Sequence, residues 1–505
     1  MLFVVRFSPE IIIKSRDVRH RNIRVLRRSL RMQSARIHPE IAVRGDWDSL
    51  EVAVPDSEAS VQEQVIQLLE RTPGIALFLL VRKLPLPDLD GVAEHTLTHY
   101  ATLLPGRRFA VRCKRTGSHP WNSLDVERHV GRHLLQHCPT ARVDLDAPEI
   151  VVKVEIHHDE LFVVERSFKG LGGYPLGTQD DVLSLISGGF DSSVASFLTM
   201  RRGLVTHFCC FRLGGRDHEL AVKDVALYLW MRYGASHRVK FVTVPFEAVV
   251  DELAARLEPG LRGVILKRMM LRAATRVADQ LRIPALVTGE CVAQVASQTL
   301  ANLAVIDQVT DKVLLRPLIV TDKQDIIDIA RRIGTEEFSR HVPEFCGAVS
   351  QKPTTRACPQ RIAEQEALFD FSILDAAVQD AQIQMIDRVM ESFGAPVPQV
   401  RSECAAIQAT LIDIRHPQER DTQALPEPLR GLPLLRIPFY ELPTRLATLS
   451  PAEHYVLYCA KGVMSRLHAA HMQAAGFTRV SVFGAQAQAD DEASATPAAS
   501  ASEGP

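Results

Sequence analysis

The sequence of 505 residues lacks several features that would place it in a familiar class. Its formal net charge is −1, so it has no overall basic surplus of the kind that marks a general nucleic-acid binder. No segment has the roughly 18 uninterrupted apolar residues of a membrane span. The opening MLFVVRF is too short an apolar run, without a basic start, for a secretory signal. We therefore expect a cytoplasmic protein with no membrane partner.

Cysteine is present, but not in the patterns that build structural sites. None of the nine cysteines belongs to a C-x-x-C pair, which argues against a structural zinc ribbon. In a reducing compartment such cysteines remain thiols. Any disulfide is therefore expected to be transient and catalytic.

The charge that is present is unevenly distributed. Residues 1–50 contain eleven Lys and Arg against five Asp and Glu, a surplus of six. The end of the chain, at 487–505, is acidic, rich in small residues and low in complexity, so we expect a disordered tail there. The length between these ends is enough for several domains.

Hydrophobic patterns divide the chain into successive α/β units. Residues 1–59 read as strands around one Arg-rich helix, and 60–168 alternate helices and strands before a hairpin. Regular alternation of strand and helix over 175–372 predicts a doubly wound, mainly parallel sheet. Helix and linker follow at 373–402, and a further small α/β unit occupies 403–486.

The segment LISGGFDSSVASFL, at 185–198, joins a predicted strand to a predicted helix. Ligands bind at such junctions in open parallel sheets. Two glycines let backbone amides turn inward, and the helix N-terminus adds positive potential. Three hydroxyls accompany them, those of Ser187, Ser192 and Ser193.

This loop matches neither of two well-known motifs. The pattern G-x-x-x-x-G-K-[ST] is absent because no lysine follows, and the nucleophile elbow G-x-S-x-G is absent too. Asp191 could position a magnesium ion or cap the helix. The residues favour a loop that holds pyrophosphate, with a plain strand–turn–helix as the alternative.

The motif SGGFDS resembles the pyrophosphate loop of the adenine-nucleotide α-hydrolases, which split ATP into AMP and pyrophosphate to adenylate a carbonyl oxygen. The wider sequence resembles the bacterial tRNA 4-thiouridine synthetases, or tRNA sulfurtransferases. The matching segments lie between about residues 169 and 483 and include GLGGYPLGTQDDVLSLISGGFDSSVAS, GVILKRMMLRAA, RPLIVTDKQDIIDIARRIGT, PEFCGAVSQKPT and CAKGVMSRL.

The resemblance implies a multidomain α/β protein. It assigns a ferredoxin-like unit to 1–59 and a THUMP RNA-binding domain to 60–168. A doubly wound pyrophosphate-loop domain of the adenine-nucleotide α-hydrolase type then occupies 175–372, and a rhodanese-like domain occupies 403–486.

The resemblance also implies an ATP site. Its residues are Leu185, Ile186, Ser187, Gly188, Gly189, Asp191, Ser192, Lys267, Gly289 and Gln298. Lys267 could reach a phosphate, Gly289 allows close backbone approach to a nucleotide, and Gln298 could read an adenine edge. Lys323 matches a lysine that the family needs to activate the uridine, where a cation would stabilise a developing oxyanion or phosphate.

Cys459 ends a predicted strand in CAKGVMSRL and precedes a loop that turns into a helix. Loop amides, the helix dipole and Lys461 would stabilise a thiolate or persulfide there. We expect this loop to be exposed. The unit resembles a rhodanese, with Asp413 and Arg415 in its Asp-x-Arg segment and Met464 where many rhodaneses carry an arginine. Met464 argues against small-anion donors and fits a persulfide from a cysteine desulfurase.

Cys346 would by itself be an ordinary loop cysteine. The resemblance makes it the resolving cysteine, which forms a redox-active disulfide with Cys459 after sulfur has left. We expect no role for the nearby Cys358. Cys209 and Cys210 lie on a predicted buried strand and are expected in the core.

Basic residues of the first two units are candidates for RNA binding. They are Arg16, Arg19, Arg21 and Arg24 in the Arg-rich helix, with Lys114 and Arg115 in RCKRTGSH. Such residues position a phosphate backbone without reading sequence, although a solvated helix surface is the alternative. The THUMP resemblance implies recognition of the tRNA acceptor end.

Together these expectations describe an ATP-dependent, Mg²⁺-assisted transfer of persulfide sulfur from Cys459 to a tRNA uridine, through an adenylated intermediate. No permanently bound metal or organic cofactor is expected. Besides tRNA and a cysteine desulfurase, the family implies a small sulfur-carrier protein for the thiamine thiazole, and a homodimer stays open. The alternatives are an ATP-dependent amidotransferase-type ligase and a non-catalytic RNA-binding or sulfur-carrier protein.

Overall fold

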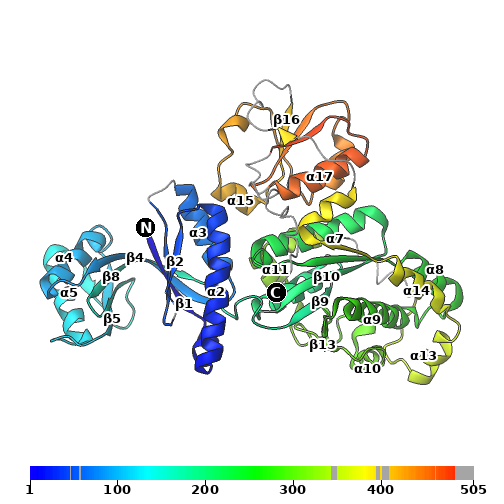
Figure 1. Cartoon of the computed structure of the whole chain (residues 1–505), viewed down its shortest axis with the longest axis horizontal. Coiled ribbons are helices and arrows are strands. Elements are labelled where there is room, and N and C mark those ends of the chain that lie inside the picture. The colour runs from blue at the N-terminus through cyan, green and yellow to red at the C-terminus, as the bar shows by residue number, and fades with distance from the viewer. Residues whose placement is uncertain are drawn as a thin grey trace, which may run out of the picture.

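The computed structural model describes residues 1–45, 47–55, 59–342, 350–393, 399–400, 409–460 and 462–483. Within these ranges the strands form three sheets, of eight, six and five strands (Figure 1). No helix in these ranges is both long and apolar enough to cross a lipid bilayer.

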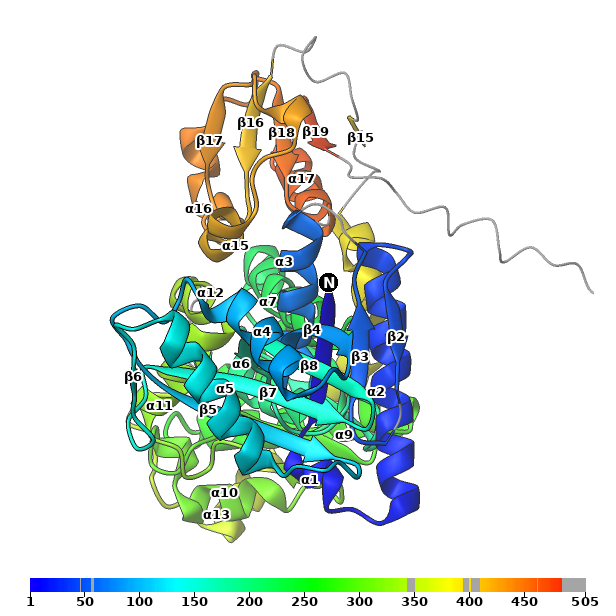
Figure 2. The same ribbon diagram turned by 90° about the vertical axis from the view of Figure 1, so that its left-hand side faces the viewer.

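The first sheet is shared by two units and has the strand order β2-β3-β1-β4-β8-β7-β5-β6 (Figure 2). Long β4 pairs with β1 through its first half and with β8 along its length, which joins the two units into one sheet. The strands are β1 (Leu2–Phe7), β2 (Ala42–Arg44), β3 (Leu50–Ala53), β4 (Ile75–Pro85), β5 (Arg108–Thr116), β6 (Arg142–Val143), β7 (Ile150–His157) and β8 (Glu160–Lys169). The helices are α1 (Pro9–Ile12), α2 (Arg16–Ile37), α3 (Ala59–Arg71), α4 (Leu89–Tyr100) and α5 (Ser123–His137).

The first unit is a ferredoxin-like β-α-β-β-α-β arrangement, but it extends beyond residue 59. The α2 side chains of Ile23, Leu26 and Leu30 recur every three or four residues and form one buried stripe. The same core contains Leu69 of α3 and Phe78 of β4. The expected boundary at residue 59 therefore separates α3 and β4 from the core that they complete, because helical periodicity does not show which sheet a helix covers.

The second sheet has the order β13-β12-β9-β10-β11-β14 and is parallel except for β14, as expected for a doubly wound domain. Its strands are β9 (Asp181–Leu185), β10 (Val205–Arg212), β11 (Lys240–Pro245), β12 (Ala285–Val287), β13 (Val313–Leu315) and β14 (Gln382–Met385). Each central strand is buried on both faces, so its sequence is a continuous apolar run and does not alternate.

Helices cover both faces of this sheet. One core contains α6 (Phe190–Arg201), α7 (Gly215–Leu229) and α11 (Lys323–Ile333), with the π-helical η1 (Trp230–Gly234) and the short α12 (Glu336–His341) beside them. The opposite core contains α8 (Glu247–Arg256), α9 (Arg262–Leu281), α10 (Leu300–Asp307), α13 (Pro359–Glu366) and α14 (Phe371–Gln379). A 3₁₀ turn, η2 (Ala296–Gln298), precedes α10, and η3 (Ile386–Phe393) follows β14.

The third sheet is wholly parallel in the order β15-β19-β18-β16-β17. Its strands are β15 (Gln399–Val400), β16 (Thr410–Asp413), β17 (Leu434–Arg436), β18 (Tyr455–Tyr458) and β19 (Val480–Phe483). The accompanying helices are α15 (Pro417–Thr422), η5 (Glu427–Leu429), α16 (Leu442–Arg445), η6 (Leu446–Thr448) and α17 (Val463–Ala474). α17 lies against α7 of the middle domain, where His468 Nε2 of α17 is 3.2 Å from Asp224 Oδ1 of α7 (Figure 1).

Candidate functional site

The loop between β9 and α6 lies at the carboxyl end of the central strand of the middle sheet. Gly188 has φ of +81°, a left-handed conformation, and Gly189 is the N-cap of α6. The Ser187 backbone N–H donates to Ser192 Oγ at 3.2 Å, and that hydroxyl donates to the Gly189 carbonyl at 3.2 Å. The loop is therefore a pre-formed turn at a helix N-terminus, which suits an anion.

The loop serines do not contribute equally. Ser187 is exposed at the mouth of the turn, whereas Ser192 is buried and hydrogen-bonded within it. Ser193 is fully buried and donates to the Phe190 carbonyl at 2.9 Å, so its hydroxyl does not face a ligand as expected. It is the fourth residue of the helix after the cap, and its direction follows from helix geometry.

Asp191 lies at the first turn of α6 and joins three elements. Its carboxylate accepts from Lys323 Nζ at 2.7 Å and from Gln294 Nε2 at 2.7 Å. Lys323 is the first residue of α11, where the helix dipole disfavours a cation by about 0.3–1 kcal/mol. The lysine is thus held against its local preference, beside the pyrophosphate loop, by a carboxylate 132 residues away.

Gly289 allows a close approach to the protein backbone. A Cβ at this position would lie 2.6 Å from the Asp191 carbonyl carbon and 2.7 Å from the Ser192 nitrogen. The segment after β12 therefore packs directly against the backbone that begins α6. The predicted approach of a nucleotide to this glycine stays a prediction.

Lys267 is engaged in an ion-pair network. Its Nζ lies 2.8 Å from Glu290 Oε1, while Arg316 Nε lies 2.7 Å from Glu290 Oε2. Burial raises the pKa of Glu290, but the two cations outweigh it, so the pKa is below its usual value. Lys267 would have to exchange Glu290 for a phosphate to contact one.

Gln298 lies in the same loop as Gln294. Its side-chain oxygen accepts from the Cys291 backbone N–H at 3.1 Å, and its own carbonyl accepts from Ala293 at 3.0 Å. The amide thus closes its own loop, and its remaining –NH₂ donors are the groups available to a base edge.

The loop at Cys459 is built in the same way, as a strand, a glycine turn and a helix. Gly462 has φ of +69° and is the N-cap of α17. The Ser465 backbone N–H donates to Cys459 Sγ at 3.3 Å, which stabilises a thiolate or a persulfide. However, Cys459 is 7% exposed and Gly462 is buried. The expectation of an exposed loop is therefore wrong for these two residues, and Cys459 belongs to a core cluster.

The Asp-x-Arg segment supports this loop from the neighbouring strand. Arg415 donates from Nε and Nη2 to the two oxygens of Asp413, at 2.9 and 2.7 Å, and both side chains are 2% exposed. The guanidinium also lies 4.9 Å from the ring of Tyr458, the residue before Cys459. These residues hold the strand ends and do not reach the sulfur through any described contact.

Comparison with known proteins gives three family matches. The model for "thiamine biosynthesis protein (ThiI)" matches residues 177–371, the THUMP domain matches 88–164, and the rhodanese-like domain matches 397–484. A protein of Azotobacter vinelandii called tRNA sulfurtransferase is 52% identical over 96% of this chain and 99% of its own length. One of the same name from Saccharophagus degradans is 48% identical over 96% of this chain and all of its own.

This chain belongs to the tRNA sulfurtransferase family. Its fold also matches solved structures. A 4-thiouridine synthetase, solved with RNA and bound ATP, has a TM-score of 0.66 at 24% identity, covering 76% of this chain and 99% of that one. PH1313 from Pyrococcus horikoshii has a TM-score of 0.50 at 18% identity, covering 66% and 99%. As an enzyme of the tRNA sulfurtransferase family, the chain combines the pyrophosphate-loop and rhodanese sites described above.

Two predicted site residues lie outside the described residues. Cys346, the predicted resolving cysteine, and Lys461, the predicted helper of Cys459, are both in this group. The expected disulfide therefore stays a prediction. The core assignment of Cys209 and Cys210 is confirmed, since both are fully buried and burial raises the pKa of Cys209 to about 12. Cys358 is exposed.

The predicted RNA-binding residues divide into two groups. The exposed ones are Arg16, Arg21, Arg24 and Lys114. Arg19 instead donates to the Trp47 carbonyl at 2.6 Å and lies 4.1 Å from its ring. Arg115 likewise binds the Gly117 carbonyl at 3.0 Å. These two hold loops of the N-terminal units, and RNA contact by any of the six stays a prediction.

Sequence reasoning missed residues that complete the pyrophosphate loop. Gln294 and Glu290 were not identified, although they stand in one short segment with Gly289. Ser339 of α12 donates to the Gly188 carbonyl at 3.1 Å. Buried His218 of α7 contacts the Ser187 backbone, and burial lowers its pKa. These residues could have been identified only from their position near the strand ends. One sequence does not show which loops lie side by side at the edge of a sheet.

Proposed function

We propose that the chain transfers persulfide sulfur from Cys459 to a uridine of tRNA and produces 4-thiouridine. The observation that carries the proposal is the coexistence, in one chain, of a loop suited to pyrophosphate and a thiol at a helix N-terminus. Membership of the tRNA sulfurtransferase family supports the combination and disfavours the ligase and non-catalytic alternatives.

The first step activates the base. The C4 oxygen of uridine attacks the α-phosphorus of ATP, pyrophosphate leaves, and the oxygen becomes an AMP ester. Loop amides at the start of α6 would hold the departing pyrophosphate. Lys323, held by Asp191 at 2.7 Å, would stabilise charge that develops on phosphate or uridine oxygen. Gly289, Lys267 and Gln298 lie in the neighbouring segments described above.

Magnesium would accompany ATP as its counter-ion. In the part of the chain that the structure describes, no group of three or more His, Cys, Asp or Glu side chains could hold a metal ion. Asp191 offers a carboxylate of the type that Mg²⁺ prefers, once Lys323 or Gln294 releases one oxygen. The rest of the coordination would come from ATP and water.

The second step exchanges oxygen for sulfur. In the direct route the outer sulfur of the Cys459 persulfide attacks C4, the C4–O bond breaks, and AMP leaves. The Cys346 thiolate then attacks Cys459 Sγ, which releases the thiocarbonyl and leaves a Cys346–Cys459 disulfide. In the alternative route Cys346 first releases hydrosulfide, which attacks C4. In both routes a dithiol reductant restores the two thiols.

A cysteine desulfurase is the proposed sulfur donor, and the THUMP and ferredoxin-like units are the proposed tRNA-binding part. The "thiamine biosynthesis" description of the family model supports a further transfer to a small carrier protein for the thiazole. The desulfurase, the carrier and a homodimeric state are all proposals here.

The test is thionucleoside analysis of tRNA from cells that depend on a variant chain. Cys459→Ala, Cys346→Ala and Asp191→Ala should each abolish 4-thiouridine. Cys358→Ala is the matched control, since it removes an exposed thiol with no assigned role. Unchanged 4-thiouridine in all three variants would overturn the proposal, and loss of thiamine alone would favour the carrier function.

A further inference from the structure

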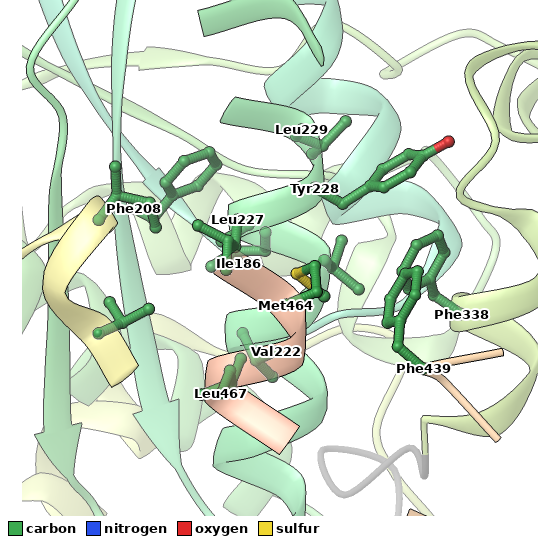
Figure 3. Close-up of a cluster of buried hydrophobic side chains, with 14 of the residues drawn as sticks. Ile186, Phe208, Val222, Leu227, Tyr228, Leu229, Phe338, Phe439, Met464 and Leu467 are labelled. Carbon is green, nitrogen blue, oxygen red and sulfur yellow. The ribbon is translucent and has the colours of Figure 1, made fainter. Parts of the chain in front are cut away.

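The rhodanese-like unit packs on one face of the ATP domain through an aromatic cluster. Phe338 of α12 has its ring centroid 4.7 Å from Phe439, 5.2 Å from Tyr440 and 6.3 Å from His416, all three from the rhodanese-like unit. Tyr228 of α7 is 4.7 Å from Phe338 and 6.3 Å from Phe439. Figure 3 shows Phe338, Phe439 and Tyr228 grouped at one side of the cluster.

A buried pair of polar side chains lies at the same interface. His468 Nε2 of α17 lies 3.2 Å from Asp224 Oδ1 of α7, with the two side chains 0% and 3% exposed. A buried carboxylate is costly unless it is partnered, so removal of either member leaves an uncompensated group. The pair therefore favours one placement of α17 on α7, whereas apolar packing alone would tolerate sliding.

The start of α17 packs in the same cluster as residues that lie next to the pyrophosphate loop. Met464 and Leu467 belong to the same buried cluster as Ile186 and Val222 (Figure 3). Val222 in turn lies 3.4 Å from the position that a Cβ on Gly188 would occupy. Met464, which we expected to influence the choice of sulfur donor, is 3% exposed and packs between the domains.

In the docked arrangement Cys459 is poorly accessible to large partners. A donor protein must bring its own cysteine persulfide into bonding contact with Cys459 Sγ, yet this residue is 7% exposed beside the interface. Loading itself is simple chemistry. The Cys459 thiolate attacks the outer sulfur of the donor persulfide, the donor S–S bond breaks, and the donor cysteine leaves as a thiolate.

We propose that the face formed by α7 and α12 is a docking surface for the rhodanese-like unit, and that Cys459 is loaded by a protein persulfide donor only when this unit leaves that face. The docked arrangement described above is then the closed state that follows loading. The proposal rests on the proposed function for the identity of the sulfur, but the docking itself is tested without it.

The docking test uses the full chain and the alkylation rate of Cys459 by iodoacetamide, read by mass spectrometry of its peptide. Phe338→Ala should raise this rate by at least about tenfold, because it shifts the equilibrium to the undocked state. Phe371→Ala is the matched control, since it removes a half-buried ring from the opposite face of the same sheet. Equal rates in wild type and Phe338→Ala, or an equal rise in the control, would overturn the proposal.

A second variant separates undocking from unfolding. His468→Gln removes the imidazole partner of Asp224 from the other side of the interface and should also speed alkylation, with an increased radius of gyration in X-ray scattering. Retained ATP binding shows that the ATP domain is folded. Faster alkylation with an unchanged radius, in both variants, would contradict undocking.

Sulfur transfer then distinguishes the two proposals. With inorganic sulfide as the donor, Phe338→Ala should form 4-thiouridine at the wild-type rate, because sulfide needs no docking. With a persulfide-loaded desulfurase, Cys459 loading should accelerate in Phe338→Ala. Absence of 4-thiouridine from the wild type with either donor would contradict the proposed function, whereas the alkylation comparison would still decide the docking.

Discussion

The loops that begin α6 and α17 share one local design but have different surroundings. Each follows a parallel strand, turns at a glycine with positive φ and presents amides at a helix N-terminus. The pyrophosphate loop leaves Ser187 exposed and aims Asp191 at Lys323. In the Cys459 loop the thiol itself is buried and belongs to a core cluster. The same backbone geometry can therefore serve an open nucleotide site or a sheltered thiol, and packing decides which.

The largest effect is expected from a substitution that disables the Cys459 loop alone. Cys459→Ser should reduce 4-thiouridine formation from a persulfide donor by at least about a thousandfold, because a hydroxyl does not form a persulfide and does not ionise near neutral pH. ATP affinity and the sulfide-supported reaction should stay near wild type. Equal loss with both donors would show that Cys459 supports the fold of the ATP site instead.

The next largest effect is expected from substitutions at the pyrophosphate loop. Asp191→Asn should lower the rate with persulfide and with sulfide alike by about 100- to 1000-fold, since it frees Lys323 from its position. Lys323→Gln should act through the same pair, so the double variant should be little worse than either single one. Additive losses in this cycle would mean that the two residues act independently.

A smaller change tests the close approach that shapes the pyrophosphate loop. Gly289→Ala places a Cβ 2.6 Å from the Asp191 backbone, so we expect a stability loss of about 1–3 kcal/mol and weakened ATP binding. Gly431→Ala is the control, because a Cβ there meets nothing within 4 Å. Urea unfolding measures the first effect and equilibrium ATP binding the second. Equal behaviour of the two variants would contradict the described contact.

The smallest expected effect is a pH dependence of the free energy of unfolding, which arises from His416 of the rhodanese-like unit. Burial, with Arg232, Arg420 and Arg71 nearby, lowers the pKa of His416 to about 4 from its usual value of about 6.5. Between these values the unfolded chain binds a proton that the folded chain does not, so stability falls as pH drops through this window.

From pH 6.5 to 5 this loss should be on the order of 1–2 kcal/mol. His416→Asn, which retains a side-chain acceptor at the start of α15, should flatten the dependence. Urea unfolding at several pH values measures it. An equally steep dependence in the variant would assign the effect to another group.

Much of the site was predictable because its signals are local. The pyrophosphate loop, Cys459 and the doubly wound sheet follow from glycine turns, strand–helix alternation and a family resemblance carried by short motifs. Asp191 and Lys323 were both predicted as site residues, but the contact between them was not predicted. Its members are 132 residues apart, and only strand order brings α11 to the edge where α6 begins.

By itself, then, the sequence determined which segments become strands and helices, where the glycine turns fall, and to which family the motifs are similar. Three features depended on the tertiary structure. These are the completion of the first core by α3 and β4, the engagement of Lys267 by Glu290, and the burial of Cys459. Each depends on contacts between residues far apart in the chain, because side-chain periodicity fixes which face of an element is apolar but not which surface covers it.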